Sequence, residues 1–195
     1  MRVMIFDHME ECTDAEVQHM LPLVSAQRRE QALKYKHTFG QFCCLKSWLM
    51  LYDLLDERMK GLMDEWIYNE HGKPSFTPSP LHSFTPYFSI SHCKQGIAVA
   101  IDDQPIGIDI EAIRHADEEL IARTMNEQER VGMDDRKFTR IWTQKEAIVK
   151  AQGVGIVSFE QLQSVIDNRE SNIETVEKEK YIYSIAYGKL HCIGA

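Results

Sequence analysis

The chain has 195 residues, of which 44% are hydrophobic and 27% are charged, as is ordinary for a folded globular protein. Its formal net charge of −8 argues against nonspecific binding to nucleic acid or to a membrane surface, because proteins that do either are normally basic. The apolar runs are also too short to span a bilayer. An anionic ligand would therefore need a local basic patch.

The cysteines and the first residues bear on the cellular compartment. There are 5 cysteines; this odd count and the lack of a C-x-x-C spacing predict neither a disulfide framework nor a zinc site. Met1–Asp7 has the pattern of a strand and is followed at once by acidic residues, unlike a signal peptide. We therefore expect a cytoplasmic protein whose thiols are reduced and mostly buried.

The first part of the chain predicts one strand, three helices and a second strand. Arg2–Asp7 is the first strand, and Thr13–Glu16 has the spacing of a capping box, which predicts a helix start. Residues 25–35 open with a serine typical of an N-cap and predict a second helix. Apolar residues recur at helical spacing over 39–55 and predict a longer helix. Trp66–Asn69 follows as a short strand.

The middle of the chain predicts a turn, a loop and three strands. His71–Pro74 reads as a turn, and the proline-rich stretch Ser75–Pro86 reads as a loop. Short linkers of turn composition then join three predicted strands, which are Tyr87–Ser91, Gly96–Asp102 and Ile106–Ala112.

The last part predicts helices followed by a strand meander. Asn126 is a candidate N-cap of a short helix, and a strong helical pattern runs from about Asp135 to Gln152, where Gly153 ends it. Four strands are then predicted, at Gln163–Asn168, Ile173–Glu177, Tyr181–Tyr187 and Lys189–Ile193. Because strand, helices and strands occur twice in this order, we predict an α+β fold of two similar lobes, residues 1–102 and residues 103–195.

Two acidic residues alternate with isoleucines in the segment P-I-G-I-D-I-E at 105–111. Alternate residues of a strand share a face, so the isoleucines would be buried on one side, while Asp109 and Glu111 project together from the other. Two neighbouring carboxylates repel each other unless a cation neutralises them, and oxygen ligands suit a hard divalent cation such as Mg²⁺. The same pattern also fits a strand with a solvated acidic face.

The predicted helix over 135–152 places three notable side chains along one line. Trp142, Glu146 and Lys150 are spaced four residues apart and lie on successive turns of one face. Glu146 and Lys150 fit a plain surface ion pair, which contributes ~0.3–0.5 kcal/mol. They equally fit a site in which Glu146 completes the carboxylate group and Lys150 reaches a phosphate, and the spacing alone does not choose.

Three further segments carry weaker signals. Ser91 and His92 lie at a strand end before a turn, where a lone histidine fits a plain turn or core residue. If His92 is functional, it would donate to an anion rather than bind a metal ion, since no second histidine lies nearby. The G-K-P segment at 72–74 by itself indicates only a β-turn and no particular function. The G-V-G segment at 153–155 follows a helix rather than opening one, so it lacks the context of a dinucleotide fingerprint or a P-loop.

Taken in this order, the segments resemble the 4′-phosphopantetheinyl transferase superfamily, in its larger, surfactin-synthetase-activating type. The matching stretches are G-K-P at 72–74, F-S-I-S-H at 88–92, P-I-G-I-D-I-E at 105–111, W-T-Q-K-E-A-I-V-K at 142–150 and G-V-G at 153–155. The third and fourth stretches are the specific ones. The resemblance implies a monomer of two similar lobes related by a pseudo-twofold axis, with coenzyme A in the cleft between them.

The resemblance also assigns roles to particular residues. It implies that Asp109, Glu111 and Glu146 hold Mg²⁺, or alternatively Mn²⁺, against the pyrophosphate of coenzyme A, and that Lys150 contacts the same phosphates. For the nucleotide end, the implied contacts are Ser91 and His92 to the phosphates, Lys73 and Pro74 to the adenine, and Arg28 to the 3′-phosphate.

The implied reaction joins coenzyme A to a carrier protein. The serine hydroxyl of an apo acyl or peptidyl carrier protein would attack the β-phosphate and release 3′,5′-ADP, with Asp109, Lys150 and Glu146 as the catalytic residues. Glu146, or a water ordered by it, is the candidate base for the serine proton. Protein positioning and electrostatics would supply most of the catalysis.

Some features depart from the family pattern. Cys43 and Cys44 stand near the start of the long helix, where the family often has a basic residue, and Glu129 lies near a family acidic position without a secure register. The segment Ile113–Thr124 is a candidate surface for the carrier protein. Three arginines are candidates for a basic docking patch, namely Arg114, Arg123 and Arg130.

Two other functions fit the same residues. A metal-dependent phosphohydrolase acting on coenzyme A or another nucleotide would use the same carboxylates and lysine. A non-catalytic module that binds coenzyme A or a carrier protein would keep the cleft without the chemistry. The need for a carrier protein in product formation separates these alternatives from the transferase.

Overall fold

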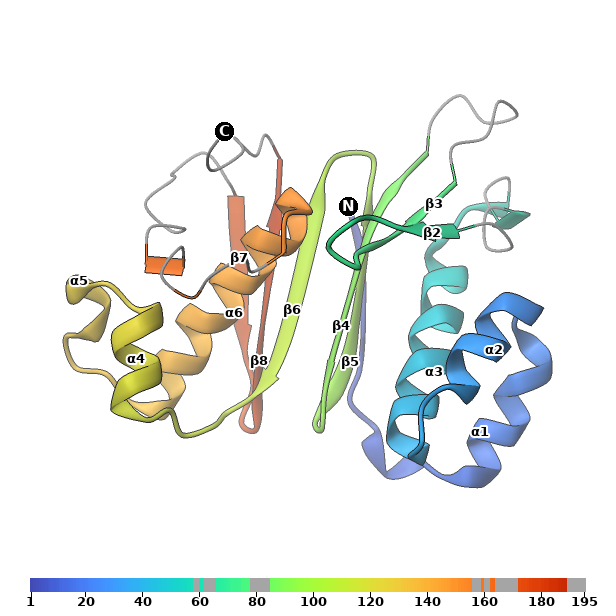
Figure 1. Cartoon of the computed structure of the whole chain (residues 1–195), viewed down its shortest axis with the longest axis horizontal. Coiled ribbons are helices and arrows are strands. Elements are labelled where there is room, and N and C mark those ends of the chain that lie inside the picture. Colours follow the sequence, from blue (N-terminus) through green and yellow to red (C-terminus); the bar gives the residue numbers. More distant parts are fainter. Residues whose placement is uncertain are drawn as a thin grey trace.

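The computed structural model describes residues 1–57, 60–61, 66–77, 85–155, 159, 162–163 and 172–188. Two three-stranded antiparallel sheets lie side by side in the middle of the molecule, and helices cover the outer side of each (Figure 1). Helices α1–α3 lie on one side and α4–α6 on the other. This arrangement confirms the predicted α+β fold, while the pseudo-twofold relation between the lobes stays a prediction.

The N-terminal sheet has the strand order β1-β5-β4. Its strands are β1 (Arg2–Phe6), β4 (Tyr87–Cys93) and β5 (Gly96–Asp102), all of them predicted. The helices beside it are α1 (Asp14–Met20), α2 (Ala26–Leu33) and α3 (Thr38–Leu54), with single 3₁₀ turns at Met9–Glu11 and Leu21–Leu23. The predicted caps form, because the Thr13 hydroxyl accepts from the Glu16 amide and the Ser25 hydroxyl from the Arg28 amide.

A two-stranded hairpin of β2 (Trp66–Tyr68) and β3 (Pro74–Phe76) crosses the upper part of the N-terminal sheet in the view of Figure 1. The first residues of the predicted loop Ser75–Pro86 therefore belong to a strand. The local sequence is proline-rich and has no alternation, but pairing with β2 and burial of Phe76 fix it in an extended form. Gly72 has a φ of +79°, which the tight turn requires.

The C-terminal sheet has the strand order β6-β8-β7. Its strands are β6 (Ile106–Ala112), β7 (Asn172–Glu177) and β8 (Tyr181–Tyr187), as predicted. The helices beside it are α4 (Glu118–Thr124), α5 (Glu127–Arg130) and α6 (Asp135–Gln152). The other two predicted strands of the meander, Gln163–Asn168 and Lys189–Ile193, lie essentially outside the described residues.

The ends of these helices follow ordinary capping chemistry. The sequence reading missed α4, which is only seven residues long and has little apolar periodicity; Asp117 caps it by accepting from the Leu120 amide. Asn126 opens α5 in a complete capping box with Glu129. Asp134 caps α6, and Gly153 ends it in the left-handed conformation that favours glycine.

The hydrophobic core has three parts. One lies between α1–α3 and the N-terminal sheet, one lies under α6, and a third fills the space between the two sheets. The third contains Ile106, Ile108 and Ile110 of β6 packed with Ala98 and Ala100 of β5. The predicted apolar face of β6 is therefore buried between the sheets.

Serine hydroxyls join the two sheets where β4 lies next to β6. The Ser89 hydroxyl accepts from the Ile108 amide at 3.0 Å, and the Ser91 hydroxyl accepts from the Ile110 amide at 3.3 Å. These bonds satisfy edge amides of β6 that would otherwise be buried without partners.

The structure bears on two expectations from the sequence, the state of the cysteines and the absence of a membrane-spanning segment. The four cysteines among them, Cys12, Cys43, Cys44 and Cys93, are free thiols, two of them buried and two partly exposed. Within the same part of the chain, the helices are all too short or too polar to cross a membrane.

Candidate functional site

A cavity of about 460 Å³ lies between the two halves of the molecule. Its walls come from α2, α3, the β2–β3 hairpin and β4 on one side, and from β6 and α6 on the other. Eight of the nine residues to which the sequence assigns a site role line it: Arg28, Pro74, Ser91, His92, Asp109, Glu111, Glu146 and Lys150. The fold thus gathers side chains from distant segments into one space.

Asp109 is at the centre of the polar contacts. Its Oδ1 accepts from Lys150 Nζ at 2.6 Å and from the Ser91 hydroxyl at 2.8 Å, while Lys150 Nζ also donates to Ser91 at 3.0 Å. The Asp109 side chain is nearly inaccessible, with a residue exposure of 3%. The alternative of a solvated acidic strand face is therefore wrong, because α6 covers that face of β6.

Gly107 explains how α6 comes so close to β6. A Cβ atom at this position would lie 1.9 Å from the Ala147 carbonyl oxygen and 2.4 Å from the Ala151 amide nitrogen. Only glycine leaves room for the helix backbone, and this approach carries Glu146 and Lys150 to Asp109. The signal for this contact in the sequence is Gly107 itself, because a glycine inside a strand often marks a close backbone approach.

The acidic side chains of α6 and β6 perturb one another. Burial, then the charges of Asp109 and Glu111, raise the pKa of Glu146 to about 7, while Lys150 acts in the opposite direction. Burial and the Asp109 charge likewise raise the pKa of Glu111. Lys150 pairs with Asp109 rather than with Glu146, so the plain surface pair at i, i+4 is not the arrangement adopted.

The carboxylate groups on the cavity wall formed by β6 and α6 suit a divalent cation. Asp109 Oδ2 is buried and has no hydrogen-bond partner among the described residues, and such an atom is costly unless something binds it. The neighbouring donors are carboxylate oxygens, which hard cations prefer. As placed, however, no three acidic, histidine or cysteine side chains in the described ranges converge to hold a metal ion.

The opposite wall is neutral or basic. Arg28 is buried, and its Nε and Nη2 donate to the Cys44 carbonyl oxygen at 3.0 and 2.6 Å, while its guanidinium lies 4.3 Å from the Trp48 ring centre. Burial lowers the pKa of Arg28. Burial also raises the pKa of Cys43 to about 12, which keeps this thiol uncharged.

His92, which is exposed, and Pro74, which is partly buried, also line the cavity. The His92 ring packs edge-on against Phe39, with the ring centres 5.9 Å apart. Protein atoms around the ring, followed by the Lys150 charge, lower the pKa of His92. A neutral imidazole at this position has one N–H to donate.

Lys73 is the one predicted site residue that does not line the main cavity. It borders a smaller adjoining cavity of about 250 Å³. Its Nζ donates to the carbonyl oxygens of Ile106 and Lys150, and burial, then the Lys150 charge, lower its pKa to about 8. The structure therefore gives this lysine contacts to the backbone of the opposite half, which the sequence did not indicate.

The candidate docking arginines differ in their surroundings. Arg114 is exposed, and its guanidinium lies 5.2 Å from the Trp142 ring centre. Arg130 is partly buried and donates to the Met125 and Ala122 carbonyl oxygens. Glu129, left unassigned by the sequence, pairs with Lys145 at 2.6 Å and is not among the residues that line the main cavity.

Comparison with known proteins gives a consistent result. The sequence model described as the 4′-phosphopantetheinyl transferase superfamily matches residues 105–192. The chain is 25% identical over 148 residues to the 4′-phosphopantetheinyl transferase psf-1 of Bacillus pumilus, covering 72% of this chain and 63% of the relative. It is 37% identical over 118 residues to the 4′-phosphopantetheinyl transferase AcpT of Salmonella typhimurium, covering 55% and 58%.

A third relative is covered more fully. The 4′-phosphopantetheinyl transferase gsp of Aneurinibacillus migulanus is 25% identical over 177 residues, which cover 81% of this chain and 72% of the relative. The chain spans less than two thirds of the length of psf-1 and AcpT.

Proposed function

From the match of residues 105–192 to the 4′-phosphopantetheinyl transferase superfamily, we propose that the chain transfers the 4′-phosphopantetheine arm of coenzyme A to a serine of an apo carrier protein. In this reaction the serine oxygen forms a bond to the β-phosphorus of coenzyme A. The pyrophosphate bond breaks, and 3′,5′-ADP leaves. The names of the relatives support this proposal, and so does a cavity between the two halves that is lined by most of the residues to which the sequence assigns site roles.

The observation that carries the proposal is the group of Asp109, Lys150 and Ser91 inside the cavity. The three side chains contact one another within 3.0 Å, and Glu111 and Glu146 line the same wall. A lysine beside carboxylates is a poor site for an anion by itself, because the net charge is negative. It becomes suitable when a divalent cation joins the carboxylates, as in other phosphoryl transfers.

Asp109, Glu111 and Glu146 are the residues that would hold Mg²⁺, or Mn²⁺ in its place. The unpartnered Asp109 Oδ2 and the raised pKa values of both glutamates fit that role. When bound, the cation would neutralise the pyrophosphate and polarise the phosphorus that is attacked.

The protein groups have separate tasks in this proposal. Lys150 would direct its ammonium toward the phosphates and stabilise the charge that develops on the leaving group. Ser91 and His92 would donate to nucleotide phosphates, and Pro74 would border the adenine. Glu146, or a water ordered by it, is the candidate to take the serine proton.

The carrier protein would approach from the side of Ile113–Thr124. The proposal takes the carrier protein to have an acidic surface. The candidate contacts to that surface are Arg114 and Arg123, which are both exposed. Charge complementarity of this type mainly changes the association rate and its dependence on salt. Charge reversal at Arg114 should therefore raise the apparent KM for the carrier more than it lowers kcat.

The direct test is intact mass spectrometry of an apo acyl carrier protein incubated with the purified chain, coenzyme A and Mg²⁺. We expect the carrier to gain one phosphopantetheine, and we expect EDTA or Glu146→Ala to prevent the gain. Loss of coenzyme A without any carrier would support a phosphohydrolase instead. Binding of coenzyme A with no gain on several unrelated carriers would support a non-catalytic binding module.

A further inference from the structure

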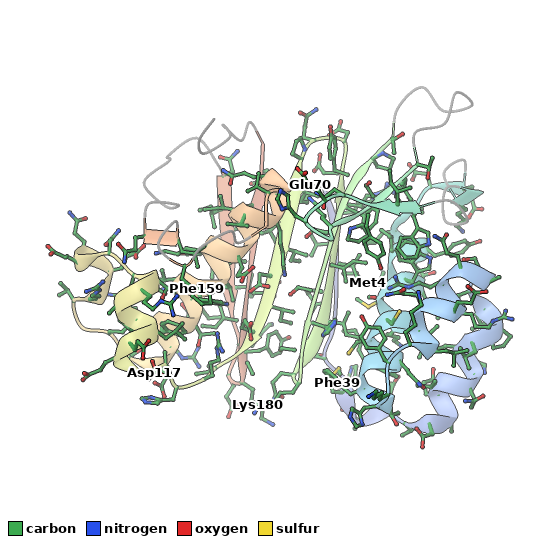
Figure 2. All side chains as sticks on the ribbon, viewed as in Figure 1. Met4, Phe39, Glu70, Asp117, Phe159 and Lys180 are labelled. Carbon is green, nitrogen blue, oxygen red and sulfur yellow. The ribbon has the colours of Figure 1, made fainter. Side chains whose placement is uncertain are left out.

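Two side chains of the β2–β3 hairpin hold the end of α6, although the hairpin and the helix are far apart in the sequence. Asn69 Nδ2 donates to the Gly153 carbonyl oxygen at 2.8 Å. Lys73 Nζ donates to the Lys150 carbonyl oxygen at 2.5 Å and to the Ile106 carbonyl oxygen at 3.2 Å. Figure 2 shows the hairpin turn, at the labelled Glu70, beside the upper end of α6.

Asn69 uses its two amide atoms for two different purposes. Its Oδ1 accepts from the His71 amide at 3.0 Å and from the Lys73 amide at 2.8 Å, which closes the turn of the hairpin. Its Nδ2 is the atom that reaches Gly153. One side chain therefore shapes the turn with its oxygen and joins the turn to the helix with its nitrogen.

The helix end is a place where such partners matter. The last carbonyl groups of a helix have no intrahelical amide to accept from, and a cation near them also interacts favourably with the helix dipole. Lys73 adds a second donor to the Lys150 carbonyl, which also accepts from the Gly153 amide at 3.3 Å, and Asn69 supplies a donor to the carbonyl of Gly153, the residue that ends the helix. The end of α6 is thereby tied to the opposite half of the molecule and not only to its own sheet.

The residue held by its backbone is the same residue whose side chain enters the cavity. Lys150 Nζ lies 2.6 Å from Asp109 Oδ1 and 3.0 Å from the Ser91 hydroxyl. A shift of the last turn of α6 would move this ammonium away from both partners. Misplacement of a reacting group by about 1 Å can slow catalysis by on the order of 10²-fold.

We propose that Asn69 and Lys73 are positioning residues that clasp the end of α6 to the hairpin, so that the Lys150 ammonium stays beside Asp109 and Ser91. The hydrogen bonds of Asn69 and Lys73 to the end of α6, called the clasp below, are a property of the fold. Only the effect of the clasp on the transfer rate rests on the function proposed above.

Asn69→Asp separates the two purposes of the asparagine. Aspartate keeps an oxygen that accepts from His71 and Lys73, but it has no donor for Gly153, whereas Asn69→Ala loses both. Lys73→Met removes the donors to the helix end, and Lys73→Arg restores donors of similar reach. Matched controls outside the cavity are Asn126→Ala, which removes a helix cap, and Lys137→Met, which removes a bond to the Val131 carbonyl.

The experiment combines hydrogen exchange of the amides at 149–153 with steady-state transfer kinetics on the full chain. We expect Asn69→Asp, Asn69→Ala and Lys73→Met to speed exchange at these amides about 10-fold or more and to lower kcat about 10-fold, with a smaller change in the KM for coenzyme A. Lys73→Arg should restore much of both. The two control variants should leave exchange at 149–153 and kcat unchanged.

The proposal is overturned if Asn69→Asp matches the unmodified chain in exchange at 149–153, because the asparagine would then act only within the turn. It is equally overturned if exchange rises but kcat does not fall in an active enzyme. If the unmodified chain shows no transfer at all, the proposed function fails, and the exchange data still decide whether the clasp exists.

Discussion

The two walls of the cavity differ in charge, although each is built from an antiparallel sheet and a long helix. The wall from β6 and α6 carries three carboxylates and one lysine: Asp109, Glu111, Glu146 and Lys150. The wall from the N-terminal half carries neutral or basic groups: Arg28, Cys43, Cys44, Ser91 and His92. One architecture thus supplies an acidic surface suited to a cation and a facing surface suited to an anionic ligand.

The two halves also differ in how the helix meets the sheet. Large side chains such as Ile97 and Val99 of β5 belong to the core on which α3 packs. These side chains separate the α3 backbone from the sheet. At β6, Gly107 brings the α6 backbone into direct contact. The functional side chains project from this closer contact, where a small displacement changes every distance in the group.

The largest effect is expected on the acidic wall, from Asp109→Asn. The change removes the charge that pairs with Lys150 and one carboxylate ligand for a cation. Transfer, measured as phosphopantetheine gained by the carrier protein, should therefore fall on the order of 10³-fold. Glu177→Gln is the control, because Glu177 pairs with Arg136 outside the cavity and should leave the rate unchanged. A loss below 10-fold for Asp109→Asn would contradict the assignment.

The contact between α6 and β6 is tested by Gly107→Ala. The added methyl group would overlap the Ala147 carbonyl, so the free energy of unfolding in urea should fall by about 3 kcal/mol. Gly61→Ala is the matched control, since a Cβ there meets no atom within 4 Å. A Gly107→Ala variant of unchanged stability would mean that the helix can move away at no cost.

The cost of burying Glu146 beside Asp109 and Glu111 is tested by Glu146→Gln without divalent cations. The pKa of Glu146 is raised to about 7 in the folded chain, from the ordinary glutamate value of 4.5. The folded chain therefore loses stability as the pH rises from 4.5 to 7, because the same carboxyl group ionises first in the unfolded chain. Glu146→Gln removes this loss. The variant should therefore gain about 1–3 kcal/mol over the unmodified chain at pH 8 and little at pH 4.5, measured by urea unfolding in EDTA.

The same two proteins are then compared with Mg²⁺ added, where the unmodified chain should benefit more. Mg²⁺ should raise the unfolding free energy of the unmodified chain more than that of Glu146→Gln, since a ligand stabilises the state that binds it. Equal stabilisation of both proteins would remove Glu146 from the set of metal ligands.

The smallest effect is expected on the neutral wall, from Arg28→Lys. Lysine cannot reproduce both bonds to the Cys44 carbonyl, so unfolding should become easier by about 1–2 kcal/mol. Arg29→Lys is the control on the same helix: Arg29 also donates to two backbone carbonyls, of Leu21 and Val24, but it is exposed, so water can replace the bonds that lysine does not make. If Arg28 also contacts the 3′-phosphate, Arg28→Lys should raise the KM for coenzyme A more than the KM for its 3′-dephospho form.

Much of the fold is predictable from local chemistry in the sequence. Serine, threonine and asparagine caps predict the starts of α1, α2 and α5, and alternation predicts β6 with its isoleucines inward. Helical periodicity predicts α3 and α6 to within a few residues. The misses, β3 and α4, are short elements that tertiary contacts hold in place, which local patterns do not encode.

The candidate site is predictable in its members but not in its contacts. Motif spacing selects Asp109, Glu146 and Lys150, and the cavity brings them together. Spacing also suggests that Glu146 and Lys150 pair along the helix, whereas Lys150 reaches across to Asp109 and Ser91. Nothing local indicates that Lys73 and Asn69 bond to the backbone of α6.

The sequence by itself determined which residue types alternate along β6, where the helices begin and which motifs occur, because capping and periodicity act over a few residues. Only the tertiary structure decided that Asp109 is buried, that Arg28 bonds to the Cys44 carbonyl and that a hairpin holds the end of α6. These contacts join segments far apart along the chain. They depend on how closely the backbones approach, as Gly107 permits at β6.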